Sequence, residues 1–106
     1  MIQFCEKTLL YTDGVDRERL LAGGPLYDAT LWNIALIGEA ANHIPAAVKG
    51  LGPTIPWRDV VDTRNNLIHH YFGIDDNAVW EIITVHIPAL LPQLRGLLES
   101  LGESSR

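Results

Sequence analysis

One short segment of this sequence concentrates polar and titratable side chains. It reads RNNLIHHYFG, from Arg64 to Gly73, and it holds an arginine, two asparagines, two adjacent histidines and a tyrosine. Histidine can take up or release a proton near neutral pH, and arginine presents a permanently charged, planar fork that matches phosphate oxygens. The segment is therefore either a catalytic cluster or a polar patch satisfied by its neighbours.

The spacing of these residues leaves the geometry of such a site open. Each residue of a helix turns by about 100°, so Arg64 and Tyr71 share one face. Asn65 and His69, four residues apart, share another face, on which the amide can orient the imidazole. Arg64 and His69 diverge by about 140° on an ideal helix. A tightening of the helix before Gly73, or a second subunit, can still bring both groups to one cleft.

An arginine and a histidine without a set of metal ligands suit the cleavage of RNA. In that reaction the ribose 2′-hydroxyl is deprotonated and attacks its own phosphate, while negative charge develops on the phosphoryl oxygens. Because the substrate supplies the nucleophile, the protein only positions it, transfers protons and stabilises charge. A salt-bridged surface pair or a capping cluster is the alternative that spacing alone leaves open.

The sequence lacks the patterns of the commonest other sites. His69 and His70 are adjacent and point apart on a helix, and no His-x-x-x-His or Glu-x-x-His spacing occurs. Cys5 is the single cysteine, so a thiolate cage for zinc cannot form. A Gly-rich phosphate loop and a nucleophile elbow are also missing. We therefore predict a site that uses no metal and no other cofactor.

The elements that position this segment should be helices, because apolar residues recur at helical spacing along nearly the whole chain. The expected helical segments are a short one ended by Asp13-Gly14, a turn or two ended by Gly23-Gly24, Pro25 to His43, Trp57 to Phe72, and a last one from Asp75 or Asp76 to about Leu101. The prediction is an all-α fold, a bundle of four to five helices forming a single domain over residues 1–106.

Glycine and proline mark where two of these helices should end or bend. Gly73 follows the helix from Trp57 to Phe72, where a left-handed residue commonly ends a helix. Pro88 and Pro92 each lack a backbone N–H, so the last segment should kink or split near them.

Length and composition favour one soluble domain. The chain has 106 residues, of which 47% are hydrophobic and 20% charged, and this argues against disorder. The net charge is −5 with neutral histidines, which is not typical of a protein that coats nucleic acid, so any RNA contact should be local. The single cysteine, the lack of a signal-peptide core and the lack of a long apolar run favour a cytoplasmic protein that does not bind a membrane.

The expected helix from Pro25 to His43 is apolar on two faces. One stripe consists of Tyr27, Leu31, Ile34 and Ala41, and the other of Ala29, Trp32, Leu36 and Ala40. A helix that is apolar on most of its circumference is usually buried on most of it, and a few helices cover one stripe more easily than two. A homodimer through this helix explains the pattern. A central helix wrapped by its own neighbours is the alternative.

Three stretches give the sequence a family resemblance. LIGEAANHIP, IPWRDVVDTRNNLIHHYFGID and VWEII occur in this order, and together they resemble the HepT-like toxin family, a branch of the HEPN superfamily. The resemblance covers about Tyr27 to Leu98 and centres on the pattern Arg, four residues, His, one residue, Tyr. It implies a HEPN-like helical bundle that dimerises, with two Arg–His motifs facing a shared cleft. The first helix is shorter than is usual in that family.

The resemblance also implies an activity and a partner. The family's members are toxins of toxin–antitoxin pairs and cleave RNA as metal-independent endonucleases. Carried onto this chain, Arg64 would hold the scissile phosphate, His69 would be the general acid or base, and Asn65 would help orient the site. A minimal nucleotidyltransferase, the antitoxin, would attach AMP to Tyr71, and the added bulk and phosphate charge would repel RNA.

Residues next to the motif require separate interpretations. A lone carboxylate in an apolar helix is costly, so Glu39 should pair with a cation, with Arg64 as the candidate, and support the site rather than react. His70 is expected to face solvent or to pack, and it is not the motif histidine. Trp57 and Trp80 fit core anchors better than platforms for stacked bases.

A rival function is not enzymatic. In this reading the chain is a helical partner subunit that binds a nucleotidyltransferase, or its nucleotide, and cleaves nothing. The acidic balance of the chain favours it, because two arginines and two aspartates cancel between Trp57 and Phe72.

Overall fold

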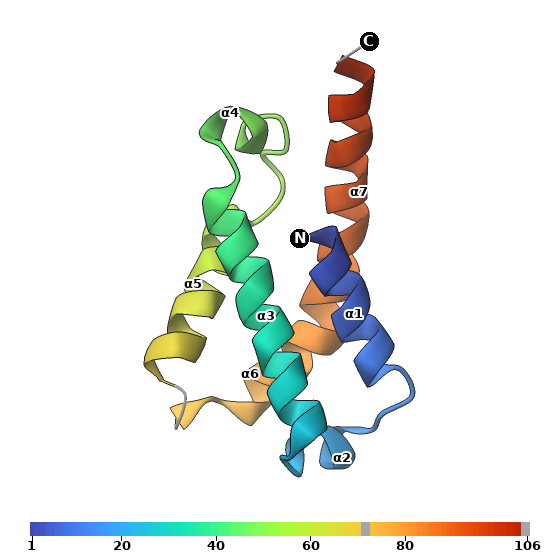
Figure 1. Ribbon diagram of the computed structural model, residues 1–106, viewed down its shortest axis with the longest axis vertical. Helices are drawn as coiled ribbons and strands as arrows, with labels where there is room; N and C mark the ends of the chain where they lie inside the picture. Colours follow the sequence, from blue (N-terminus) through green and yellow to red (C-terminus); the bar gives the residue numbers. More distant parts are fainter. Residues whose placement is uncertain (71–72, 105–106) are drawn as a thin grey trace.

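The polar segment lies at the end of one helix in an all-α bundle. The computed structural model describes residues 1–70 and 73–104, and this part of the chain contains no strand, as the sequence predicted (Figure 1). The helical elements in chain order are α1 (Ile2–Thr12), α2 (Arg17–Leu21), α3 (Pro25–His43), α4 (Ala46–Lys49), α5 (Trp57–His69), α6 (Asp76–Glu81), η2 (Ile82–His86) and α7 (Ile87–Ser104).

Helix α3 connects the two sides of the bundle. It runs antiparallel to α5, its main neighbour, and it also packs against α1 (Figure 1). The continuous segment of α6, η2 and α7 packs against α1 on the other side. The fully or nearly fully buried apolar side chains form one cluster, which consists of Cys5, Leu20, Leu31, Ile34, Ile37, Ile55, Leu67, Val79, Ile83, Ile87, Leu90, Leu91, Leu94 and Leu97. No described helix is both long enough and apolar enough to span a membrane.

Local sequence signals set several helix ends. α1 ends at Thr12, and Gly14 takes a left-handed φ of 71° that only glycine adopts easily. Pro25 opens α3, where its missing N–H costs nothing because the first helical N–H groups have no partner in the helix. Asp75 caps α6 by accepting a hydrogen bond from the backbone N–H of Asn77 at 2.9 Å. These three boundaries confirm the sequence prediction.

The predicted end of α5 is wrong. The helix stops at His69 rather than Phe72, and the residue that caps it is His70, whose N–H donates to the carbonyl oxygen of Asn66 at 2.9 Å. Gly73 is therefore not the capping residue of α5. Tyr71 and Phe72 lie outside the described residues.

The C-terminal segment contains a π-helical turn, η2, just before Pro88. Val79, Ile83 and Ile87 are buried at intervals of four residues. On an unbroken α-helix, residues spaced by four drift around the axis by about 40° per step, and the wider π turn offsets that drift. The predicted split at the prolines is not observed, because α7 runs without a break through Pro88 and Pro92, and the π turn ends two residues before Pro88.

Candidate active site

Arg64 lies at a point where α5 approaches α3 very closely. A Cβ atom built on Gly38 of α3 would come within 2.2 Å of the Cβ atom of Arg64 and 3.0 Å of the carbonyl oxygen of Val60. No other residue than glycine fits at that point without movement of one helix. This close contact between the two helices therefore fixes the position of the Cβ atom of Arg64.

The guanidinium of Arg64 is held by two oxygen atoms. Its Nη2 atom lies 2.8 Å from Oε2 of Glu39, and its Nη1 atom donates a hydrogen bond of 2.8 Å to Oδ1 of Asn65. The Oε2 atom of Glu39 is buried and accepts no well-aligned hydrogen bond within the described part of the chain. The attraction between opposite charges therefore holds the ion pair. The predicted pairing of Glu39 with Arg64 is observed.

Glu39 has a second neighbour, His43, one turn further along α3. The Nδ1 atom of His43 lies 2.9 Å from the carbonyl oxygen of Glu39 and 3.5 Å from its Oε1 atom. The carboxylate thus lies between a guanidinium and an imidazole. Arg64 is the closer of the two, and its side chain is 29% exposed against 71% for His43, so it is the stronger partner.

His69 is not brought to Arg64 within one chain. It is exposed in the last turn of α5, and because α5 remains α-helical up to His69, the two residues diverge by about 140°. Among the described residues the His69 ring has no hydrogen bond or ion pair, and the Oδ1 atom of Asn65 accepts from Arg64 instead. His70, also exposed, faces solvent as expected. Tyr71 lies outside the described residues.

An exposed apolar strip separates the two motif residues. Ile68 is 52% exposed and Val61 is half-buried, and on the helix both lie between Arg64 on one side and His69 on the other. On the neighbouring helix α3, Trp32 is 66% exposed and Leu36 is half-buried. We call Trp32, Leu36, Val61 and Ile68 the apolar strip. The first stripe predicted on α3 is largely buried within the chain, whereas the second is only half-buried and leaves Trp32 exposed.

The groups gathered around Arg64 are one cation, one carboxylate and one amide. A cluster of three or more His, Cys, Asp or Glu side chains that could hold a metal ion does not occur in residues 1–70 and 73–104. A half-buried guanidinium with an adjacent amide suits an anion with several oxygen atoms, such as a phosphodiester.

Sequence reasoning missed Gly38 and His43. Gly38 stands inside a helix, where glycine costs about 1 kcal/mol relative to alanine, and this cost was the signal that a close contact requires it. His43 lies four residues after Glu39, a spacing that brings two side chains together on a helix. The two tryptophans behave as predicted. Trp57 and Trp80 are half-buried against the core, and the Trp57 indole N–H donates to the carbonyl oxygen of Gly52 at 3.0 Å.

The sequence of this chain matches known proteins along most of its length. A sequence profile described as ribonuclease HepT-like matches residues 1–97. The chain belongs to the HepT-like ribonuclease family. The resemblance that the Arg64–His69–Tyr71 pattern indicated is thereby confirmed.

Three relatives illustrate how far the similarity reaches. A candidate RNase of Caldanaerobacter subterraneus subsp. tengcongensis is 29% identical over 99 residues, which span 93% of this HepT-like chain and 88% of that protein. A candidate RNase of Methanocaldococcus jannaschii is 27% identical over 103 residues, 97% of this chain and 89% of the relative. A candidate ribonuclease HepT of Thermococcus cleftensis is 42% identical over 62 residues, 58% and 56% of the two chains. No solved structure is significantly similar to this chain.

Proposed function

We propose that this HepT-like protein is an RNA endonuclease that works without a metal ion and acts as the toxin of a toxin–antitoxin pair. The observation that carries the proposal is the placement of Arg64, whose guanidinium is anchored by Glu39 and Asn65 beside an exposed strip that leads to His69. A guanidinium held in this way is suited to bind the scissile phosphate and to stabilise its developing charge.

The reaction would use the ribose of the substrate as its nucleophile. The 2′-oxygen loses its proton and forms a bond to phosphorus, and the bond from phosphorus to the 5′-oxygen breaks. The products are a 2′,3′-cyclic phosphate and a 5′-hydroxyl end. His69 would take the first proton or give the second, and Arg64 would bind the phosphoryl oxygens, with Asn65 orienting the guanidinium.

The complete site would require a homodimer, because Arg64 and His69 diverge on α5. The apolar strip lies between them, and its exposed Trp32 and Ile68 supply the apolar surface that a partner copy would bury. A two-fold axis through the strip would place the Arg64 edge of one α5 against the His69 edge of the other. Each cleft would then combine groups from both chains.

A complementation experiment tests this arrangement. Arg64→Ala and His69→Ala proteins should each be inactive, and their mixture should recover about a quarter of wild-type activity, since half of the dimers are mixed and each mixed dimer has one intact site. Trp32→Glu should prevent both dimerisation and recovery. A mixture that stays inactive although mixed dimers form would contradict a shared site.

Silencing of the toxin would occur at Tyr71, two residues after His69. We propose that a minimal nucleotidyltransferase, the antitoxin partner, attaches AMP to its hydroxyl. The support is the position of Tyr71 in the family pattern, beside the exposed His69, where an added phosphate would repel the RNA backbone. Mass spectrometry of the chain incubated with such a partner and ATP should show one or more added AMP groups, which are lost in Tyr71→Phe.

A second function, a non-catalytic partner subunit for a nucleotidyltransferase, has one observation in its favour. The charge of Arg64 is already balanced by Glu39, and the Trp57–His69 helix carries equal numbers of arginines and aspartates. An RNA enzyme usually offers its substrate more positive charge than this.

One experiment decides between the two functions. RNA cleavage is measured in chelator with unmodified protein, comparing wild type, His69→Ala and His70→Ala at matched folding and dimer content. We expect His69→Ala to lose activity by about a hundredfold and His70→Ala, a neighbour that is also exposed, to stay near wild type. Loss of cleavage in chelator would contradict metal independence. If wild type cuts neither tRNA nor total RNA, the chain is the non-catalytic subunit.

A further inference from the structure

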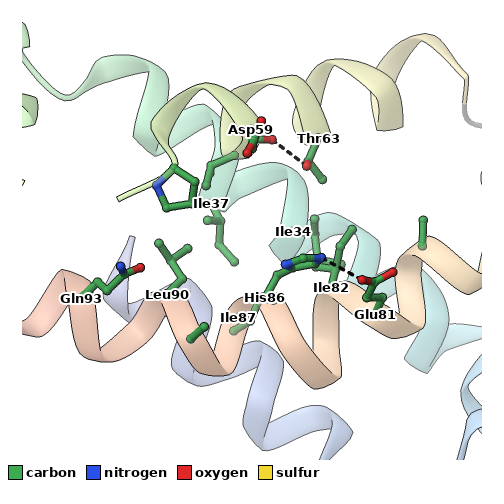
Figure 2. Close-up of a pocket in the computed structure, with 14 residues that line it drawn as sticks. Ile34, Ile37, Asp59, Thr63, Glu81, Ile82, His86, Ile87, Leu90 and Gln93 are labelled. Carbon is green, nitrogen blue, oxygen red and sulfur yellow. Dashed lines mark hydrogen bonds and ion pairs between the residues drawn. The ribbon is translucent and has the colours of Figure 1, made fainter. Parts of the chain in front are cut away.

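A groove separates α5 from the C-terminal helical segment. It has a volume of about 420 Å³ and runs between α5 on one side and η2 with α7 on the other, with α3 as its floor (Figure 2). None of the residues assigned to the candidate active site lines it. We call it the α5–α7 groove, and the side chains that line it are Ile34, Ile37, Pro56, Asp59, Val60, Thr63, Ala78, Glu81, Ile82, His86, Ile87, Ala89, Leu90 and Gln93.

The inner wall of the groove is apolar. Ile34 and Ile37 point into it from α3, and Leu90 faces them from α7 (Figure 2). All three are almost completely buried, so the floor is part of the core rather than a mobile surface. The volume lies within the range of about 300 to 1,000 Å³ that is usual for small-molecule sites. The groove is therefore preformed at the scale of a small ligand.

The rim carries two carboxylates and one imidazole, that of His86. Asp59 lies on the α5 side and Glu81 on the other, and neither lysine nor arginine lines the groove among the described residues. The carboxylate of Glu81 lies 3.5 Å from Nε2 of His86, whereas Asp59 has no ion pair within the part of the chain that the structure describes. An anionic ligand would be repelled here, and a cation would be attracted.

The π-helical turn contributes to this shape. Ile82 and His86, its first and last residues, both line the groove, so the turn places one apolar and one titratable side chain at the same wall. π turns of this kind are often found at functional sites.

We propose that the α5–α7 groove binds a small organic cation with an apolar body, such as an aryl- or alkylamine. The body would lie against Ile34, Ile37 and Leu90, and the ammonium would lie at the carboxylate of Asp59, which has no ion pair among the described residues. This site is separate from the proposed RNA chemistry, and it is tested without RNA.

The test compares three compounds with one apolar body and three charges, which are 1-naphthylmethylamine, 1-naphthalenemethanol and 1-naphthoate. Binding to the wild-type protein is followed by calorimetry. Because the carboxylates at the rim are partly exposed, we expect the amine to bind about fivefold more tightly than the alcohol, and the carboxylate to bind least.

Two pairs of variants locate the binding. Asp59→Asn should weaken the amine about threefold and leave the alcohol unchanged, whereas Asp62→Asn, on the same helix but outside the groove, should change neither. Ala89→Phe fills the groove from an exposed position and should abolish binding of both compounds. Ala47→Phe, at an exposed position on α4, is its control.

Three outcomes would overturn the proposal. Equal binding of all three compounds would show an apolar cavity without preference for a cation. Binding that survives Ala89→Phe would place the compounds elsewhere. If none of the three binds and a basic amphipathic peptide does, the groove is a docking site for protein and not for a small molecule.

Discussion

The two long sides of α5 differ in how they are packed. On the side of α3, the backbones approach so closely that Gly38 has room for no side chain, and the ion pair of Arg64 and Glu39 closes the contact. On the side of η2 and α7, the same helix faces a groove of about 420 Å³. One helix thus has a rigid side that carries the motif arginine and an open side that does not.

This difference shows how a small bundle can fix one residue without filling all its space. The position of Arg64 depends on a single contact between helices, which needs a glycine, and not on the whole circumference of α5. Substitutions on the rigid side should therefore cost stability, and substitutions on the open side should cost little. The predictions below test this comparison, from the largest expected effect to the smallest.

Replacing Gly38 by alanine should have the largest effect. The new methyl group would overlap the Cβ atom of Arg64, and relief requires α3 and α5 to separate, so we expect a loss of about 3 kcal/mol in the free energy of unfolding. Gly96→Ala is the matched control, since no atom lies within 4 Å of a Cβ there. Removing this helical glycine should stabilise the protein by about 0.5 to 1 kcal/mol. Equal effects of both variants in urea unfolding would show that the contact is not tight.

Alkaline pH should lower the free energy of unfolding through the buried core under α1, a region that contrasts with the open groove. Burial away from water raises the pKa of the Cys5 thiol from 9.0 to about 11, against the opposing effect of the N-terminal ammonium. The unfolded chain loses this proton first, so the stability is fully present below pH 9 and falls by about 2 kcal/mol as the pH rises to 11.

The contribution of the thiol is isolated by a variant. Urea unfolding of wild type and Cys5→Ala is measured at pH 8 to 11, and wild type should lose more stability with pH, because the variant lacks the titrating group. Parallel pH profiles would show that Cys5 is not as buried as the 0% exposure of its side chain indicates.

Replacing Glu39 by glutamine should have a moderate effect. The change keeps the shape and removes the charge that balances Arg64, and since both side chains are partly exposed, we expect a loss of about 1 kcal/mol that shrinks in high salt. Asp62→Asn is the control, because its partner Arg58 is 94% exposed and 4.0 Å away, and it should change stability by less than about 0.3 kcal/mol. If Glu39→Gln leaves the free energy of unfolding unchanged, Glu39 does not anchor Arg64 as proposed.

The smallest effect is expected for a substitution on α7 that faces the open side of α5 across the groove. Ala89→Phe places a ring in the groove from an exposed position, so it should change the free energy of unfolding by less than about 0.5 kcal/mol. Thermal unfolding measures this directly. A loss as large as that of Gly38→Ala would mean that both sides of α5 are equally tight, and the comparison would fail.

The features that sequence predicted are those that depend on neighbours along the chain. Apolar spacing, Pro25 and Asp75 gave the helices and several of their ends. The pairing of Glu39 with Arg64 was predictable because a carboxylate in an apolar helix needs a cation. The divergence of Arg64 and His69 was also predictable, since it follows from helix geometry alone.

The features that sequence did not predict depend on distances between helices. The role of Gly38 appears only when α3 and α5 are placed together. The early end of α5 at His69 was missed because Gly73 offered a stronger local signal four residues later. The groove has no sequence pattern, since its walls come from three separate segments that are apolar in any case.

The π-helical turn has a consequence for where the sequences of relatives can differ in length from this chain. A π turn contains one residue more than an α turn, so it marks a place where a helix can gain or lose a residue. Losing one residue within Ile82–His86 would let this turn return to α-helical geometry and would leave the orientation of α7 relative to α6 nearly unchanged. A relative with one residue fewer here must therefore space its apolar residues by three at this point instead of four. The interval between buried side chains at this turn therefore indicates whether a relative has the additional residue.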